Sequence, residues 1–87
     1  MATVFLPAML RELAGGTTQV AATGATVAEV IADLERQFPG IQDRLTEGGE
    51  LRSNLAVAID GEVSPDGIRE PVSEQSELHF VLALSGG

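Results

Sequence analysis

The sequence predicts an α+β fold in which a sheet of four or five strands packs on one main helix. Apolar and polar residues alternate over 2–6, 54–60 and 77–84, as they do in strands with one buried face. The stretch 26–38 instead repeats its apolar residues with the period of a surface helix. The chain has 87 residues, 44% of them hydrophobic, so we expect one small domain over 1–87.

The N-terminal part of the chain predicts two strands joined by a turn that contains glycine. In the first strand, Val4 and Leu6 lie on one face and Phe5 on the other. Pro7 has no N–H donor, so it ends this strand or marks a sheet edge. The second strand is predicted over 17–22, after a pair of glycines.

The main helix is predicted over 26–38. Thr26 and Glu29 have the spacing of a capping box, in which hydroxyl and carboxylate satisfy backbone donors reciprocally. The apolar stripe consists of Val27, Val30, Ile31, Leu34 and Phe38. Glu29 and Asp33 lie off this stripe and are interpreted as a solvated face, not as a general acid and base. Pro39-Gly40 ends the helix.

The second half of the chain predicts a hairpin and a final strand. The stretch 41–50 is interpreted as a helical turn followed by a loop. Asp60-Gly61 is a strong hairpin signal, and the return strand begins at 62–63. The residues that point inward from the strands on either side of this turn are Leu55, Val57 and Ile59, then Leu78, Phe80 and Leu82.

One helix covers only one face of such a sheet, so the other face meets solvent or a partner. If the final strand lies beside the first and third, the open face carries Phe5, Ala58, His79 and Val81. An exposed aromatic among small apolar residues predicts a docking patch, and the alternative is apolar residues scattered over an ordinary surface. His79 has no cysteine or second histidine beside it, so a solvated or partner-contacting role is predicted for it rather than catalysis.

Composition excludes several classes of function. The formal net charge of −8 repels phosphate backbones, so nucleic acid and anionic membranes are not expected as partners. A basic protein surface is a better match, although the excess of acid also serves solubility. The chain has no cysteine and one histidine, which excludes thiolate metal sites, multi-histidine metal sites and a cysteine nucleophile.

The sequence also predicts where the protein is located and which lysine-dependent sites it lacks. No basic segment precedes the first strand, and no apolar run approaches the roughly eighteen residues of a membrane helix, so a soluble, cytoplasmic protein is expected. All five cations are arginine. The absence of lysine removes a phosphate-loop lysine, a Schiff base and any amine on which copies of the chain could be linked together.

A small-residue tail, 84–87, follows the last predicted strand. Because glycine has no Cβ, a Gly86-Gly87 end is thin and can be threaded into a narrow channel, with Ser85 as a spacer. We expect this tail to be flexible and to act as a substrate, presenting its carboxylate to chemistry inside another protein. Two terminal glycines also arise by chance in about one chain in two hundred.

Taken together, three segments in this order resemble the MoaD/ThiS family of ubiquitin-like sulfur carriers. They are Leu10-Arg11-Glu12-Leu13-Ala14-Gly15-Gly16, Asp60-Gly61-Glu62 and the terminal Ser85-Gly86-Gly87. The resemblance implies the β-grasp fold, with a mixed sheet. It also implies a carrier rather than an enzyme, which could be the small subunit of a complex like molybdopterin synthase.

The resemblance further implies the chemistry of the tail. An E1-like enzyme would adenylate the Gly87 carboxylate with ATP, and a sulfur donor would convert it to a thiocarboxylate for a downstream sulfur-accepting enzyme. No bound cofactor is expected, since ATP belongs to the activating enzyme. Two alternatives remain: a protein modifier joined to lysines through Gly87, and an interaction module that conjugates to nothing.

Two segments depart from the pattern of many relatives. Gln75-Ser76 stands where they carry Gly-Asp, and Leu82-Ala83 stands where they carry a proline-containing pair. Without these prolines the backbone of the tail is less restricted before it binds a partner, which argues against the molybdopterin branch. The terminal chemistry is unaffected.

Overall fold

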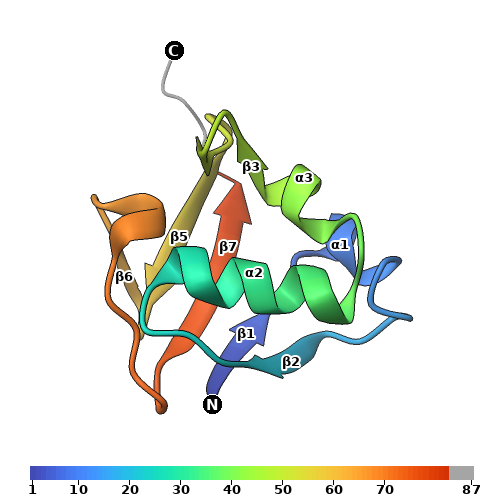
Figure 1. The fold of residues 1–87 in the computed structure, drawn as a ribbon, viewed down its shortest axis with the longest axis horizontal. Helices are drawn as coiled ribbons and strands as arrows, with labels where there is room; N and C mark the ends of the chain where they lie inside the picture. Colours follow the sequence, from blue (N-terminus) through green and yellow to red (C-terminus); the bar gives the residue numbers. More distant parts are fainter. Residues whose placement is uncertain (83–87) are drawn as a thin grey trace.

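The computed structural model describes residues 1–82, which form a five-stranded mixed sheet with a helix lying across one face (Figure 1). The strands, in spatial order, are β2 (Gln19–Ala22), β1 (Ala2–Phe5), β7 (Glu77–Leu82), β5 (Leu55–Ile59) and β6 (Glu62–Val63). The α+β class and the mixed sheet are therefore confirmed. Ala83 and the predicted tail 84–87 lie outside the described residues.

The last strand, β7, lies at the centre of the sheet. It runs parallel to β1, with Phe5 opposite His79, and antiparallel to β5, with Ala58 opposite the same histidine. The remaining two pairs, β1 with β2 and β5 with β6, are antiparallel. The expected placement of the final strand beside the first and third is thus confirmed.

The core lies between this sheet and α2 (Val27–Gln37). The apolar stripe of the helix is buried as predicted, except that Phe38 follows the helix as its C-cap and is only half-buried. Fully buried side chains of the helix and sheet include Val27, Val30, Leu34, Val4, Val57 and Leu78. Gly24 fits closely under the helix, because a Cβ at this position would lie 2.6 Å from the backbone nitrogen of Val30.

The start of α2 differs in one contact from the predicted capping box. The Thr26 hydroxyl accepts a hydrogen bond from the Glu29 N–H at 3.3 Å, as expected. The Glu29 carboxylate, however, accepts from the N–H of Ala25 at 2.9 Å and not from Thr26. Thr26 instead forms a bridge with Pro71, and the Val27 N–H donates to the Glu70 carbonyl, so the connection to β7 helps to fix the helix start.

Asp33 does not belong to a solvated face, and that interpretation was wrong. The residue is only 9% exposed, and its carboxylate accepts hydrogen bonds from the Thr23 N–H and the Gln37 amide, each at 3.1 Å. Arg36 pairs with its other oxygen. Sequence periodicity placed Asp33 off the apolar stripe but gave no sign that the end of β2 lies over that side of the helix. Glu29 is exposed as expected.

Three short elements were not predicted. A helix, α1 (Ala8–Arg11), follows β1, and a 3-10 helix, η1 (Gly67–Arg69), follows β6. The stretch 41–50 forms α3 (Ile41–Leu45) and then a small hairpin of β3 (Thr46–Glu47) and β4 (Glu50–Leu51). The predicted helical turn is confirmed, and the loop predicted around Gly48-Gly49 is the turn of this hairpin, whose two short strands were not predicted. The hairpin turns at Gly48 and Gly49, whose positive φ angles of 63° and 82° suit glycine.

Leu82 is a further correction. The alternation placed it with Leu78 and Phe80 on the buried face, but its side chain is 61% exposed. The register explains the difference, because β1 pairs with β7 only as far as His79, whereas β5 pairs with it up to Leu82. Leu82 therefore lies at the end of the sheet with a neighbouring strand on one side only.

None of the helices within residues 1–82 has the length and apolar character of a membrane span.

Candidate functional site

The sheet face opposite α2 brings the four predicted docking residues together. Phe5 and His79 are paired across β1 and β7, and their rings stack in parallel with centroids 4.3 Å apart. Ala58 lies opposite His79 on β5, and Val81 follows two residues along β7. Phe5, His79 and Ala58 are half-buried, while Val81 is 39% exposed. These four residues form what we call the open-face patch.

The register adds one residue that the sequence analysis missed. Val63 on β6 lies opposite Ala58 and so points to the same face, where its side chain is 63% exposed. The Asp60-Gly61 turn signal predicted the hairpin, and the pairing of 58 with 63 follows from a two-residue turn. The alternation on both strands could therefore have indicated Val63.

A groove of about 460 Å³ adjoins the open-face patch, between the end of β1, the start of α1 and the end of β7. It is lined by Phe5, Leu6, Pro7, Arg11, Thr18, His79, Phe80, Val81 and Leu82. We call it the terminal groove, because Leu82 is the last described residue before the Gly-Gly end. Ser85, Gly86 and Gly87, the predicted tail and modification site, lie outside the described residues.

Arg11 is the charged residue of the terminal groove that sequence reasoning did not single out as a site. It is the last residue of α1 and is half-buried, and its Nε donates to the Leu6 carbonyl at 3.1 Å. This bond fixes the guanidinium against the end of the first strand. Because α1 was not predicted, the sequence offered no way to bring Arg11 to the same face as His79.

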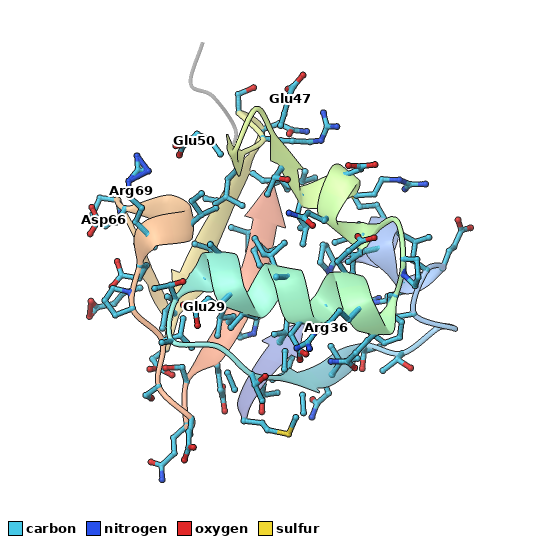
Figure 2. The ribbon with its side chains drawn as sticks, in the orientation of Figure 1. Glu29, Arg36, Glu47, Glu50, Asp66 and Arg69 are labelled. Atoms are coloured by element: carbon cyan, nitrogen blue, oxygen red, sulfur yellow. The ribbon has the colours of Figure 1, made fainter. Side chains whose placement is uncertain are left out.

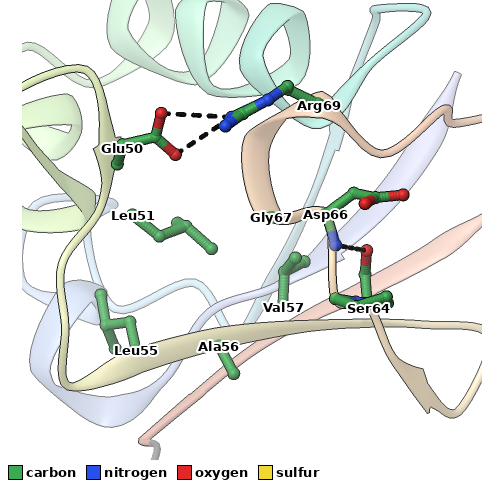
Figure 3. A pocket seen from close by; sticks show the side chains of 10 residues that line it. Glu50, Leu51, Leu55, Ala56, Val57, Ser64, Asp66, Gly67 and Arg69 are labelled. Atoms are coloured by element: carbon green, nitrogen blue, oxygen red, sulfur yellow. Dashed lines mark hydrogen bonds and ion pairs between the residues drawn. The ribbon is translucent and has the colours of Figure 1, made fainter.

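A second hollow, of about 310 Å³, lies on the other side of the molecule, between η1 and the β3–β4 hairpin. The Arg69 guanidinium donates to both oxygens of Glu50 at 3.1 and 3.2 Å, so one ion pair spans the hollow (Figure 3). Below it lie the apolar side chains of Leu51, Leu55 and Val57. Figure 2 shows Arg69 beside Asp66, with Glu50 toward Glu47 of the hairpin.

The carboxyl groups whose pKa values are lowered stabilise α2 and its connections, and they line neither the terminal groove nor the second hollow. The pKa of Asp33 is lowered, first by the Thr23 N–H and then by Gln37 and Arg36, against the opposing effect of desolvation. The pKa of Glu35 is lowered by the backbone N–H groups of Gln42 and Gly40, which it accepts at the turn between α2 and α3. Within residues 1–82, no three histidine or carboxylate side chains are placed to bind a metal ion.

Comparison with known proteins agrees with this geometry. The family model described as ThiS family matches residues 4–87. The sulfur carrier protein CysO of Mycobacterium tuberculosis is 30% identical over 90 residues, which cover 98% of this chain and 97% of the relative.

Solved structures extend the likeness to the fold. A chain in the crystal structure of the Amycolatopsis orientalis BexX/CysO complex superposes with a TM-score of 0.91 at 34% identity, with 100% of both chains covered. The small archaeal modifier protein 1 of Methanosarcina acetivorans has a TM-score of 0.79 at 25% identity, over 99% of this chain and 95% of its own. The predicted β-grasp fold is confirmed.

Proposed function

The chain belongs to the ThiS family, and from this premise we propose that it carries sulfur as a thiocarboxylate on Gly87. Its relatives are small carrier proteins, and this chain is likewise a co-substrate and not an enzyme. The observation that carries the proposal is that the family match extends through the last strand to residue 87. The Gly-Gly end therefore lies within the segment that the family shares.

The chemistry requires activation because a carboxylate is a poor acyl donor. An oxygen of the Gly87 carboxylate attacks the α-phosphorus of ATP in an E1-like enzyme, and pyrophosphate leaves. A hydrosulfide supplied by the sulfur donor then attacks the carbonyl carbon, and AMP leaves with the electrons of the broken C–O bond. The product is a thiocarboxylate, whose sulfur a downstream enzyme can use. The chain itself contributes the tail and the surface that positions it.

The open-face patch is the surface we assign to partner binding. Phe5, Ala58, His79 and Val81 lie on the face that α2 leaves uncovered, and β7 leads from this patch toward the tail. An enzyme that binds here holds the strand from which the Gly-Gly end emerges. Exposed aromatic and aliphatic side chains of this kind are typical of protein interfaces.

The departure at Gln75-Ser76 has a structural role of its own. Ser76 is buried, and its hydroxyl accepts a hydrogen bond from the Ser73 N–H at 3.0 Å. Its carbonyl accepts from the Thr3 N–H at 3.0 Å, which anchors the start of β7 beside β1. The turn before the last strand is thus closed without the Gly-Asp pair of many relatives. The proposed sulfur acceptor is of the thiazole, cysteine, molybdopterin or tRNA thiolation type.

The test is the mass of the C-terminal fragment after incubation with ATP, a sulfide source and an E1-like enzyme from the same genome. We expect an oxygen-to-sulfur exchange on the fragment that contains Gly87, and its complete loss when Gly87 is deleted. The exchange must be assigned to the fragment, because oxidation of Met1 or Met9 adds nearly the same mass. The control is Glu74→Gln in the exposed turn before β7, which should retain the exchange because it leaves the tail unchanged.

A second candidate function is protein modification through Gly87. The likeness to the small archaeal modifier protein 1 favours it, and the activation step would be the same. The acceptor separates the two functions, since a modifier forms an isopeptide bond with a target lysine. Peptides bearing a C-terminal remnant of this chain on lysine would support modification. If neither thiocarboxylate nor isopeptide forms, the chain is an interaction module.

A further inference from the structure

We propose that the terminal groove accepts an acidic side chain of the activating enzyme, held by Arg11 between apolar walls. The inference rests on the proposed function, because it specifies how the partner of that function is recognised. It also qualifies the expectation from net charge: the partner surface as a whole is basic, but the element that enters this groove carries a carboxylate.

The sign of charge in the groove is opposite to that of the molecule. The chain carries a formal charge of −8, yet the described residues that line the terminal groove include Arg11 and no aspartate or glutamate. The hollow between η1 and β4, by contrast, contains Glu50 and Asp66 beside Arg69. A positively charged lining on an acidic protein marks a place where a negative group of a partner is favoured.

The guanidinium of Arg11 has hydrogen-bond donors that are not used within residues 1–82. Three of the other arginines form ion pairs within the chain: Arg36 with Asp33, Arg52 with Glu47 and Arg69 with Glu50. Among residues 1–82, no carboxylate lies within 4 Å of the Arg11 guanidinium, and only its Nε makes a hydrogen bond. The Leu6 carbonyl therefore orients the guanidinium plane, while the terminal nitrogens of Arg11 make no hydrogen bond within residues 1–82 and can bind a carboxylate in bidentate fashion.

The walls of the groove add to the strength of such a pair. Phe5 stacks on His79 at one side, and Pro7 and Val81 provide further apolar surface. A partner segment that covers these side chains excludes water from the guanidinium, and a charge pair is stronger where water is excluded. The segment that fits best is thus an aspartate or glutamate flanked by apolar residues. Its position places the partner directly beside the end of β7.

The experiment measures the affinity of the E1-like enzyme for charge-reversal variants by calorimetry, without ATP. We expect Arg11→Glu to weaken binding by about tenfold or more, because a carboxylate would then face a carboxylate. The matched control is Arg44→Glu, which makes the same change of charge on exposed α3. Toward a basic enzyme surface, this control should leave the dissociation constant within about twofold or lower it.

Two further variants separate recognition from folding. Arg11→Lys keeps the positive charge but not the planar guanidinium, so we expect its affinity for the enzyme to lie between those of the wild type and Arg11→Gln. Circular dichroism and thermal unfolding of each variant report whether the chain as a whole remains folded. Equal effects of Arg11→Glu and Arg44→Glu in folded proteins would overturn the proposal, as would the absence of any complex between wild type and enzyme. A wild type that binds but acquires no thiocarboxylate would overturn the proposed function alone.

Discussion

The two sides of β7 differ in burial: one side belongs to the core, and the other lies on the face that we propose for partner binding. Leu78 and Phe80 point toward α2 and are almost fully buried, at 0% and 2% exposure. His79 and Val81 alternate with them and point to the open face, where they are accessible. Because successive side chains of a strand point to opposite faces of the sheet, neighbouring residues can have unrelated functions. The strand before the tail therefore contributes both to the core and to the surface that we propose for partner binding.

Charged residues differ between the two sides in the same way. On the helix side, the carboxylates of Asp33 and Glu35 accept hydrogen bonds from backbone N–H groups of the same chain. On the open side, Arg11 uses one nitrogen for the Leu6 carbonyl and keeps the others available among the described residues. These carboxylates on the helix side therefore hold the fold together, whereas Arg11 has donors that are unused within residues 1–82 and that we propose for a partner.

The largest effect is expected from Leu78→Ala. The side chain is fully buried between β1, β5 and α2, so its truncation leaves a cavity and should lower the free energy of unfolding by about 2–5 kcal/mol. Urea unfolding followed by circular dichroism measures the change. A loss below about 1 kcal/mol would contradict the assignment of this face to the core.

An intermediate effect is expected from Asp33→Asn on the helix side. Hydrogen bonds lower the pKa of Asp33 below its ordinary value of 3.8, so its ionised form stabilises the fold at higher pH. That contribution is lost as pH falls through the lowered pKa, because the carboxyl is then protonated in both states. The variant should be less stable than wild type at pH 7, and the difference should shrink toward pH 3.

Urea midpoints at the two pH values measure this effect. Glu12→Gln provides the control, since this residue is an exposed carboxylate next to α1. A difference between Asp33→Asn and wild type that stays constant from pH 7 to pH 3 would show that the charge of Asp33 is not the cause.

The smallest effect on stability is expected from Val81→Ser on the open face. The side chain is already 39% exposed, so the free energy of unfolding should change by no more than about 0.5–1 kcal/mol. Affinity for the E1-like enzyme should nevertheless fall, because Val81 lines the terminal groove and belongs to the open-face patch. Thermal unfolding and calorimetry on the same sample compare the two effects. A variant that loses stability and keeps its affinity would reverse the assignment of the two faces.

Much of the fold could be predicted because strong local patterns determine it. The alternation around Val57 and Phe80, the stripe of α2 and the Asp60-Gly61 turn each reflect burial or backbone geometry over a few residues. The short elements α1, η1 and the β3–β4 hairpin depend instead on contacts with distant segments. Arg69 of η1, for example, pairs with Glu50 of β4, which lies 19 residues away in the sequence. Such contacts leave no periodic trace in the sequence.

The site was predicted in part for the same reason. Alternation placed Phe5 and His79 on one face, and a correct strand order then brought their rings together. Arg11 could not be placed, because its position depends on the turn of α1 and on a bond to the Leu6 carbonyl. Leu82 was assigned to the wrong environment, since the register that leaves it at the sheet end is a tertiary property.

The central position of β7 has a mechanical consequence. A partner that grips the chain beyond Leu82 and pulls along the strand exerts a force across the hydrogen bonds to β1 and to β5. The two ladders then bear the load together in shear, whereas a strand at the sheet edge would be peeled away one bond at a time. The sheet should therefore stay closed under a pulling force applied at the end of β7.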